Sequence, residues 1–90
     1  MNTKNHLLYF YGEECDDCIR MLPRLERLLK ETGLELEKHE VWHNIENDAL
    51  CMEYDKDGAC GGVPFFINTK TGDTLCGEVT YSELKEWAEK

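Results

Sequence analysis

Two of the five cysteines in this 90-residue chain have a spacing that is typical of thiol chemistry. Cys15 and Cys18 are separated by two acidic residues, and a helical pattern begins directly after Cys15. Residues three apart on a helix share a face, so the two thiols would be neighbours. The first turn of a helix offers unpaired backbone N–H groups and the positive end of the helix dipole, and both favour a thiolate on Cys15. The spacing therefore predicts a dithiol in which Cys15 attacks a disulfide and Cys18 resolves the mixed disulfide.

The other three cysteines leave several interpretations open. Cys51 and Cys60 could form a second disulfide as auxiliary thiols, and Cys60 could communicate with Cys15. Cys76 is expected in the core of a short strand, because free cysteine is one of the residues most often buried. An odd number of cysteines is unusual for a disulfide scaffold, and close cysteines inside a cell are usually catalytic or metal-binding.

Metal binding is the main alternative for the sulfur cluster. A structural zinc site has four ligands, typically two close cysteine pairs or cysteines combined with histidines. This chain has one close pair, Cys15 and Cys18, although His6, His39 and His43 could each supply a nitrogen ligand. Lone histidines are more often ordinary strand or turn residues. We therefore expect neither a bound metal nor an organic cofactor.

The hydrophobic pattern indicates which elements must position the dithiol. Residues 6–11 form a continuous apolar and aromatic run, with the length and bulk of a strand buried on both faces. After Cys15, apolar residues recur at three- and four-residue spacing, which predicts an amphipathic helix that ends at Gly33. A half-buried strand is expected over 35–42. The dithiol would then lie where the first strand ends and the first helix begins.

The second half of the chain predicts a helix, a hairpin and a last helix. Asn44 can cap the first of these helices, and Gly58 can end it. Short apolar segments on either side of a turn predict the hairpin. The hairpin comprises a strand at 63–68, a turn at 69–73 and a return strand at 74–78, and the last helix is capped by Thr80 or Ser82.

These elements predict an α/β fold with the order β-α-β-α-β-β-α in a single domain over residues 1–90. A crossover helix makes the first two strands parallel, and the hairpin makes the last two antiparallel. The resulting four-stranded mixed sheet, flanked by helices, would bury the aromatic run 9–11 and Trp87. Trp42 either packs against a helix or lines a substrate groove.

The dithiol and its surroundings resemble the thioredoxin and glutaredoxin-like superfamily. Cys15-Asp-Asp-Cys18 is followed by Pro23, as in the active-site helix of that superfamily, and Gly62-Val63-Pro64 falls where these proteins have their cis-proline loop. Gly77 stands where a glycine is common after the fourth strand. The resemblance covers nearly the whole chain. It implies a thioredoxin-like fold, a cis bond before Pro64, and a substrate segment that pairs with the backbone of Val63.

The chain also departs from this pattern around the dithiol. Glu14 stands where thioredoxins commonly have tryptophan, and Tyr9 stands where they bury an aspartate that assists proton transfer. Acidic residues replace the basic ones of a glutathione site: Glu13, Glu14, Asp16 and Asp17. Their negative charge opposes a thiolate on Cys15 and repels glutathione, so a reducing pair that receives glutathione poorly is expected.

The expected function is that of a thiol–disulfide oxidoreductase that reduces protein disulfides. Its partners would be a disulfide-containing protein substrate and an external electron donor such as a reductase. Two alternatives remain at this point. One is a non-catalytic thioredoxin-like module that holds a metal or a protein partner through its cysteines. The other is a redox sensor in which the Cys51–Cys60 and Cys15–Cys18 pairs exchange oxidation states.

Composition narrows the range of other partners. Nineteen acidic residues against ten basic ones give a net charge of −9, which disfavours nucleic acids and anionic membranes. No window approaches the roughly 18 apolar residues of a membrane span. The apolar run after the N-terminus is too short for a secretory signal. A cytoplasmic monomer is therefore expected.

Overall fold

A computed structural model describes residues 5–90 of the chain. Its order of strands and α-helices is the predicted β-α-β-α-β-β-α, with a short 3-10 turn, η1, after the second helix. The elements are β1 (Leu7–Tyr11), α1 (Asp16–Thr32), β2 (Glu37–Glu40), α2 (Ile45–Tyr54), η1 (Lys56–Gly58), β3 (Phe65–Asn68), β4 (Thr74–Cys76) and α3 (Tyr81–Glu89). Residues 1–4 of the predicted domain lie outside the described residues.

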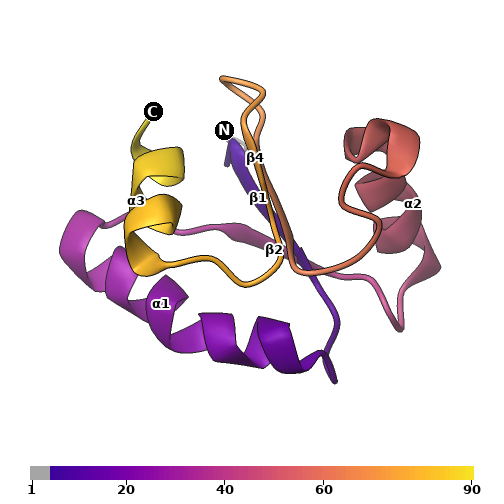
Figure 1. Ribbon diagram of the computed structural model, residues 1–90, viewed down its shortest axis with the longest axis horizontal. Helices are drawn as coiled ribbons and strands as arrows, with labels where there is room; N and C mark the ends of the chain where they lie inside the picture. Colours follow the sequence, from indigo (N-terminus) through magenta and orange to yellow (C-terminus); the bar gives the residue numbers. More distant parts are fainter. Residues whose placement is uncertain (1–4) are drawn as a thin grey trace.

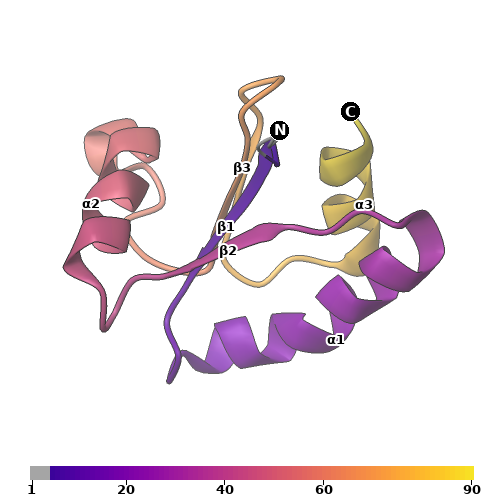
Figure 2. The same ribbon diagram turned by 180° about the vertical axis from the view of Figure 1, so that it is seen from behind.

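The four strands form one mixed sheet in the order β2-β1-β3-β4. β1 pairs with β2 in parallel, β1 with β3 antiparallel, and β3 with β4 antiparallel, which confirms both predicted pairings. Helices α1 and α3 cover one face of the sheet, and α2 covers the other (Figures 1 and 2). In the part of the chain that the structure describes, no helix is long and apolar enough to cross a membrane.

Strand β1 is central and buried on both faces, as its apolar run predicts. Alternate side chains point to opposite faces, so Leu7 and Tyr9 pack toward α1 and α3 while Leu8 and Phe10 pack toward α2. The larger core also contains Met21, Leu25, Leu28, Leu36, Phe66, Leu84, Trp87 and Ala88, and the smaller one contains Val41, Cys51, Phe65 and Ile67. Complete burial of such a side chain contributes about 1.5–3 kcal/mol. The two cores therefore fix the position of β1, and the chain continues from the end of this strand to Cys15.

Most helix ends follow the residues that the sequence predicts, but the prediction that Gly58 ends the second helix is wrong. Asp55 leaves the helical region (φ −91°, ψ 60°), so α2 ends at Tyr54 and Gly58 belongs to the separate turn η1. Gly33 adopts φ 76° and donates its N–H to Leu29 O, which ends α1. Asn44 accepts a hydrogen bond from the backbone of Asn47 and caps α2. Thr80, rather than Ser82, caps α3. The predicted strand over 35–42 is shorter in the structure, because only Glu37–Glu40 pair with β1.

Candidate dithiol site

Cys15 is the residue that caps the N-terminus of α1. After β1 the chain turns through the buried Gly12, whose carbonyl accepts a hydrogen bond from Cys15 N at 3.1 Å. Cys15 has extended backbone angles (φ −79°, ψ 116°), and its Sγ accepts the backbone N–H of Cys18 at 3.2 Å. A cap oxygen normally takes this role. The sulfur therefore sits at the positive end of a helix, where it can hold negative charge.

Cys18 lies one turn into the helix and is only 3% exposed. Burial raises the pKa of its thiol to about 12, and the hydrogen bond with Cys15 acts in the same direction. Cys18 consequently remains a neutral thiol near neutral pH. The two cysteines that the sequence paired thus lie together but differ in environment, and Cys15 is the one suited to act as nucleophile.

Tyr9 lies beneath the dithiol and forms a contact that the sequence did not reveal. Its hydroxyl donates a hydrogen bond to the carbonyl oxygen of Cys18 at 3.5 Å, and Tyr9 acts on the Cys18 thiol by opposing the rise in its pKa that burial causes. Burial raises the pKa of Tyr9 well above its usual range, so it stays a neutral phenol that can donate this bond. The resemblance identified Tyr9 only as a replacement for aspartate. The sequence feature that could have indicated this contact is the hydroxyl of a tyrosine within the buried run of β1.

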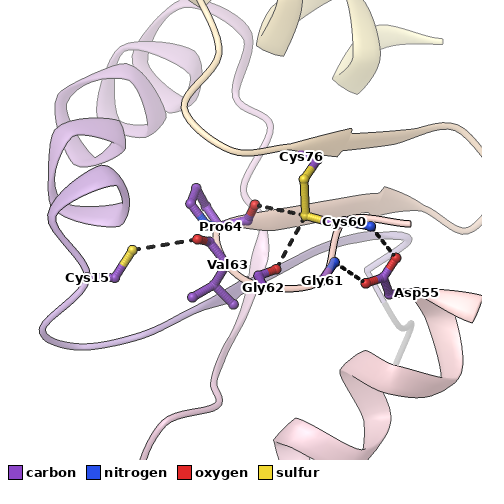
Figure 3. Close-up of a disulfide and its surroundings, with 8 residues drawn as sticks. All are labelled: Cys15, Asp55, Cys60, Gly61, Gly62, Val63, Pro64 and Cys76. Carbon is purple, nitrogen blue, oxygen red and sulfur yellow. Dashed lines mark hydrogen bonds between the residues drawn. A yellow bond between two sulfur atoms is a disulfide. The ribbon is translucent and has the colours of Figure 1, made fainter. Parts of the chain in front are cut away.

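Cys15 faces the loop that precedes β3. Its sulfur is 3.8 Å from the carbonyl oxygen of Val63, 48 positions further along the chain (Figure 3). The Val63–Pro64 peptide bond is cis, as the resemblance implies. The structure therefore brings together all four residues that were predicted as the principal site: Cys15, Cys18, Val63 and Pro64.

Three attachments hold this loop in place. Gly77, at φ 80°, donates its N–H to Pro64 O at 2.8 Å. The carboxylate of Asp55 accepts the backbone N–H groups of Cys60 and Gly61, each at 2.9 Å. The third is a disulfide between Cys60 and a cysteine of β4 (Figure 3). The carbonyl that meets Cys15 is thus fixed from both sides of the loop.

That disulfide joins Cys60 to Cys76, so Cys51 and Cys60 do not form the second disulfide that the sequence left open. The register of the hairpin places Phe65 opposite Cys76, and the turn before β3 returns Cys60 to the same edge. Their Cα atoms are 5.5 Å apart, a normal disulfide separation. The expectation that Cys76 lies in the core is also wrong, because Cys76 is exposed on the edge strand β4.

Cys51 is a free cysteine on the buried face of α2. Burial raises the pKa of its thiol to about 11, and the charges of Asp55 and Asp48 add to this effect. Since thiolate is the reactive form, Cys51 is poorly suited to be an auxiliary thiol. It packs with the smaller core instead.

Two of the four carboxylates that were predicted to oppose a thiolate have basic partners. Asp17 pairs with Arg20, and Glu14 pairs with the ring of His43 at 2.8 Å. The hydrogen bond that the His43 ring donates to Glu14 raises the pKa of His43, and the charge of Glu14 adds to the shift. The negative field around Cys15 is therefore weaker than the residue types alone suggest.

The cysteines do not converge with histidines in the way that a metal site requires. Within residues 5–90, the one group of three ligand-type side chains close enough to share an ion is Glu13, Glu14 and His43. It is exposed and contains no cysteine. Nothing in this arrangement supports a metal held through sulfur.

The sequence matches no protein-family model, and the search of curated proteins returned no match. A function for this chain therefore has to be inferred from the chemistry of the residues around Cys15.

Proposed function

We propose that this chain is a thioredoxin-like thiol–disulfide oxidoreductase that reduces disulfides in proteins. The observation that carries the proposal is the position of Cys15. Its sulfur accepts a backbone N–H at the start of a helix and lies 3.8 Å from a carbonyl of the Val63–Pro64 loop. A nucleophile and a backbone edge that could hold an extended segment are thus adjacent. The order of the strands and helices around them also supports a thioredoxin-like fold.

In the first step, the thiolate of Cys15 attacks one sulfur of the substrate disulfide. A bond forms between Cys15 Sγ and that sulfur while the substrate S–S bond breaks. The departing substrate sulfur leaves as a thiolate and takes a proton from solvent. The fixed carbonyl of Val63 would orient the segment that carries the disulfide.

In the second step, Cys18 loses its proton and attacks Cys15 Sγ. The Cys15–Cys18 disulfide forms, and the second substrate sulfur leaves and is protonated. The substrate gains two electrons and two protons, and the enzyme dithiol loses them. Tyr9 would stabilise the thiolate that develops on Cys18 by donating a hydrogen bond to it, and Tyr9 would keep its own proton. An external dithiol reductant must then restore the enzyme.

The test is the reduction of insulin by this protein with dithiothreitol as the electron donor. We expect turnover above the rate of dithiothreitol alone, and loss of that turnover in Cys15→Ser. Cys51→Ser is the matched control, because it removes the remaining free thiol, which is buried and has a pKa of about 11. It should keep most of the activity.

Two results would contradict the proposal. One is undiminished insulin reduction by Cys15→Ser. The other is an inactive wild-type protein that nevertheless shows a folded circular dichroism spectrum and a reducible Cys15–Cys18 disulfide.

A further inference from the structure

A groove of about 590 Å³ begins at the Val63–Pro64 loop and runs beside α2. Val63 therefore lies between the dithiol and the groove, since its carbonyl contacts Cys15. The groove is lined by Val41, Trp42, Asp48, Cys51, Met52, Asp55, Asp57, Gly58, Gly61, Gly62 and Val63. A segment held by the loop would continue naturally into this groove.

The walls of the groove include large apolar side chains that water reaches. Trp42 is 53% exposed and Met52 is 63% exposed, although tryptophan and methionine are usually buried. Trp42 lies against Gly12, where an added Cβ would be 2.4 Å from the indole ring. Gly12 thus allows the indole to pack next to the turn that leads into Cys15. An exposed apolar surface of this kind beside a nucleophile indicates a contact for another molecule.

Among residues 5–90, the charged side chains that line the groove are all acidic. Three aspartates line it, Asp48, Asp55 and Asp57, and no basic side chain of residues 5–90 does so. Lys56 lines the hollow beside the disulfide instead. The charges of Asp48 and Asp55 raise the pKa of Cys51 in the wall, which shows that their field reaches the groove. Asp55 is committed to the loop backbone, so Asp48 and Asp57 are the carboxylates available to an incoming group.

We propose that this groove selects the substrate: it holds an extended polypeptide segment with an apolar side chain and a lysine or arginine close to the disulfide. The apolar side chain would lie against Trp42 and Met52, and the cation would lie between Asp48 and Asp57. Charge complementarity selects this occupant over an acidic or neutral segment. The inference rests on the proposed function, because it names the substrate class of the same site.

The test uses three peptides of equal length in which serine replaces the reactive cysteine, so that binding is measured without chemistry. Each has one leucine, flanked by lysine, glutamine or glutamate. Binding is followed by the fluorescence of Trp42, and the Trp42→Phe variant identifies the signal of the buried Trp87. We expect the lysine peptide to bind about tenfold more tightly than the glutamate peptide at low ionic strength, and this difference should shrink in high salt.

Two double variants distinguish the effect of the groove on peptide binding from the effect of the overall charge of the protein. Asp48→Asn/Asp57→Asn should reduce the preference for lysine to about threefold or less, because two exposed ion pairs are lost. Asparagine also tolerates the positive φ of 68° at position 57. Glu26→Gln/Glu86→Gln removes the same charge from α1 and α3 on the opposite face of the sheet. This control should keep the full preference.

Equal affinity for the three peptides would overturn the inference, and so would an equal loss of preference in both double variants. Reduction of bis(2-hydroxyethyl) disulfide, a small uncharged substrate, distinguishes this failure from failure of the proposed function. If that disulfide is reduced but the peptides are not distinguished, the groove assignment is wrong and the reductase remains. If lysine is preferred but neither insulin nor the small disulfide is reduced, the groove is a binding site and the proposed activity is wrong.

Discussion

The two cysteine pairs on either side of the Val63–Pro64 loop differ in the properties that govern thiol chemistry. Cys15 and Cys18 are buried, reduced and placed at the N-terminus of a helix. Cys60 and Cys76 are more exposed, oxidised and joined between the loop and the edge strand β4. The loop itself contacts Cys15 through Val63 and is anchored by Cys60.

The environment of each cysteine in the fold, rather than its residue type, therefore determines what its sulfur can do. A sulfur that accepts a helix N–H and faces an accessible loop can react. A sulfur already bonded to a neighbouring strand restrains the loop that meets Cys15. Cys51, which lacks both a helix terminus and a partner sulfur, serves the core.

The largest expected effect is in the alkylation of the reduced protein by iodoacetamide. The pKa values of about 12 for Cys18 and about 11 for Cys51 leave thiolate fractions of about 10⁻⁴ and 10⁻³ at about pH 8. Cys15, whose sulfur accepts the backbone N–H of Cys18 at the start of the helix, should therefore be labelled faster than either. Because both pKa values are raised, labelling of Cys51 should rise about tenfold for each pH unit below about 11. Peptide mapping by mass spectrometry measures the labelling rates of the three thiols. Comparable rates would mean that their environments do not distinguish their reactivity.

The next effect concerns the disulfide that anchors the loop. Cys60→Ala/Cys76→Ala removes a cross-link between residues 16 apart in sequence. A loop of that length restricts the unfolded chain enough to lower the free energy of unfolding by about 3 kcal/mol when the link is lost. Urea denaturation of the variant and of the wild type checks this. A change below about 0.5 kcal/mol would mean that the hydrogen bonds that Asp55 accepts and Gly77 donates suffice to hold the loop.

A smaller effect is expected from Tyr9→Phe, which tests whether Tyr9 stabilises the thiolate of Cys18. The hydrogen bond from Tyr9 lowers the pKa of Cys18, opposing the effect of burial, so its loss should leave less Cys18 thiolate. At about 1 kcal/mol for a buried hydrogen bond, the mixed disulfide on Cys15 should be resolved about fivefold more slowly. Single-turnover quenching experiments would measure its lifetime. Tyr11→Phe is the matched control, and an equal effect in both variants would assign the change to packing.

The smallest effect is the titration of the exposed pair of His43 and Glu14 beside the dithiol. The pKa of His43 is raised above its usual 6.5, first by the hydrogen bond that its ring donates to Glu14 and then by the charge of Glu14. A raised folded-state pKa means that the stabilisation is complete below pH 6.5 and is lost as pH rises through the folded-state value. An NMR titration of the His43 ring should show this shift, and Glu14→Gln should bring the pKa back toward 6.5. An unchanged pKa in that variant would show that the pair does not shield Cys15.

Local patterns were sufficient to predict most of the framework. The apolar run of β1, the amphipathic spacing of α1 and the residues that cap the helices all act over a few positions. The same holds for the placement of Cys15 at a strand-to-helix junction. The bounds of β2 were less predictable, because a strand ends where its neighbour stops pairing with it.

The sequence by itself determined the elements, their order and the position of Cys15 at the start of a helix, because periodicity and capping are properties of neighbouring residues. Only the tertiary structure decided that Cys60 pairs with Cys76, that Tyr9 supports Cys18, and that Val63 meets Cys15 from 48 positions away. These contacts depend on strand register and on loop closure. Both are settled by the packing of the two cores against β1, and no short stretch of sequence encodes them.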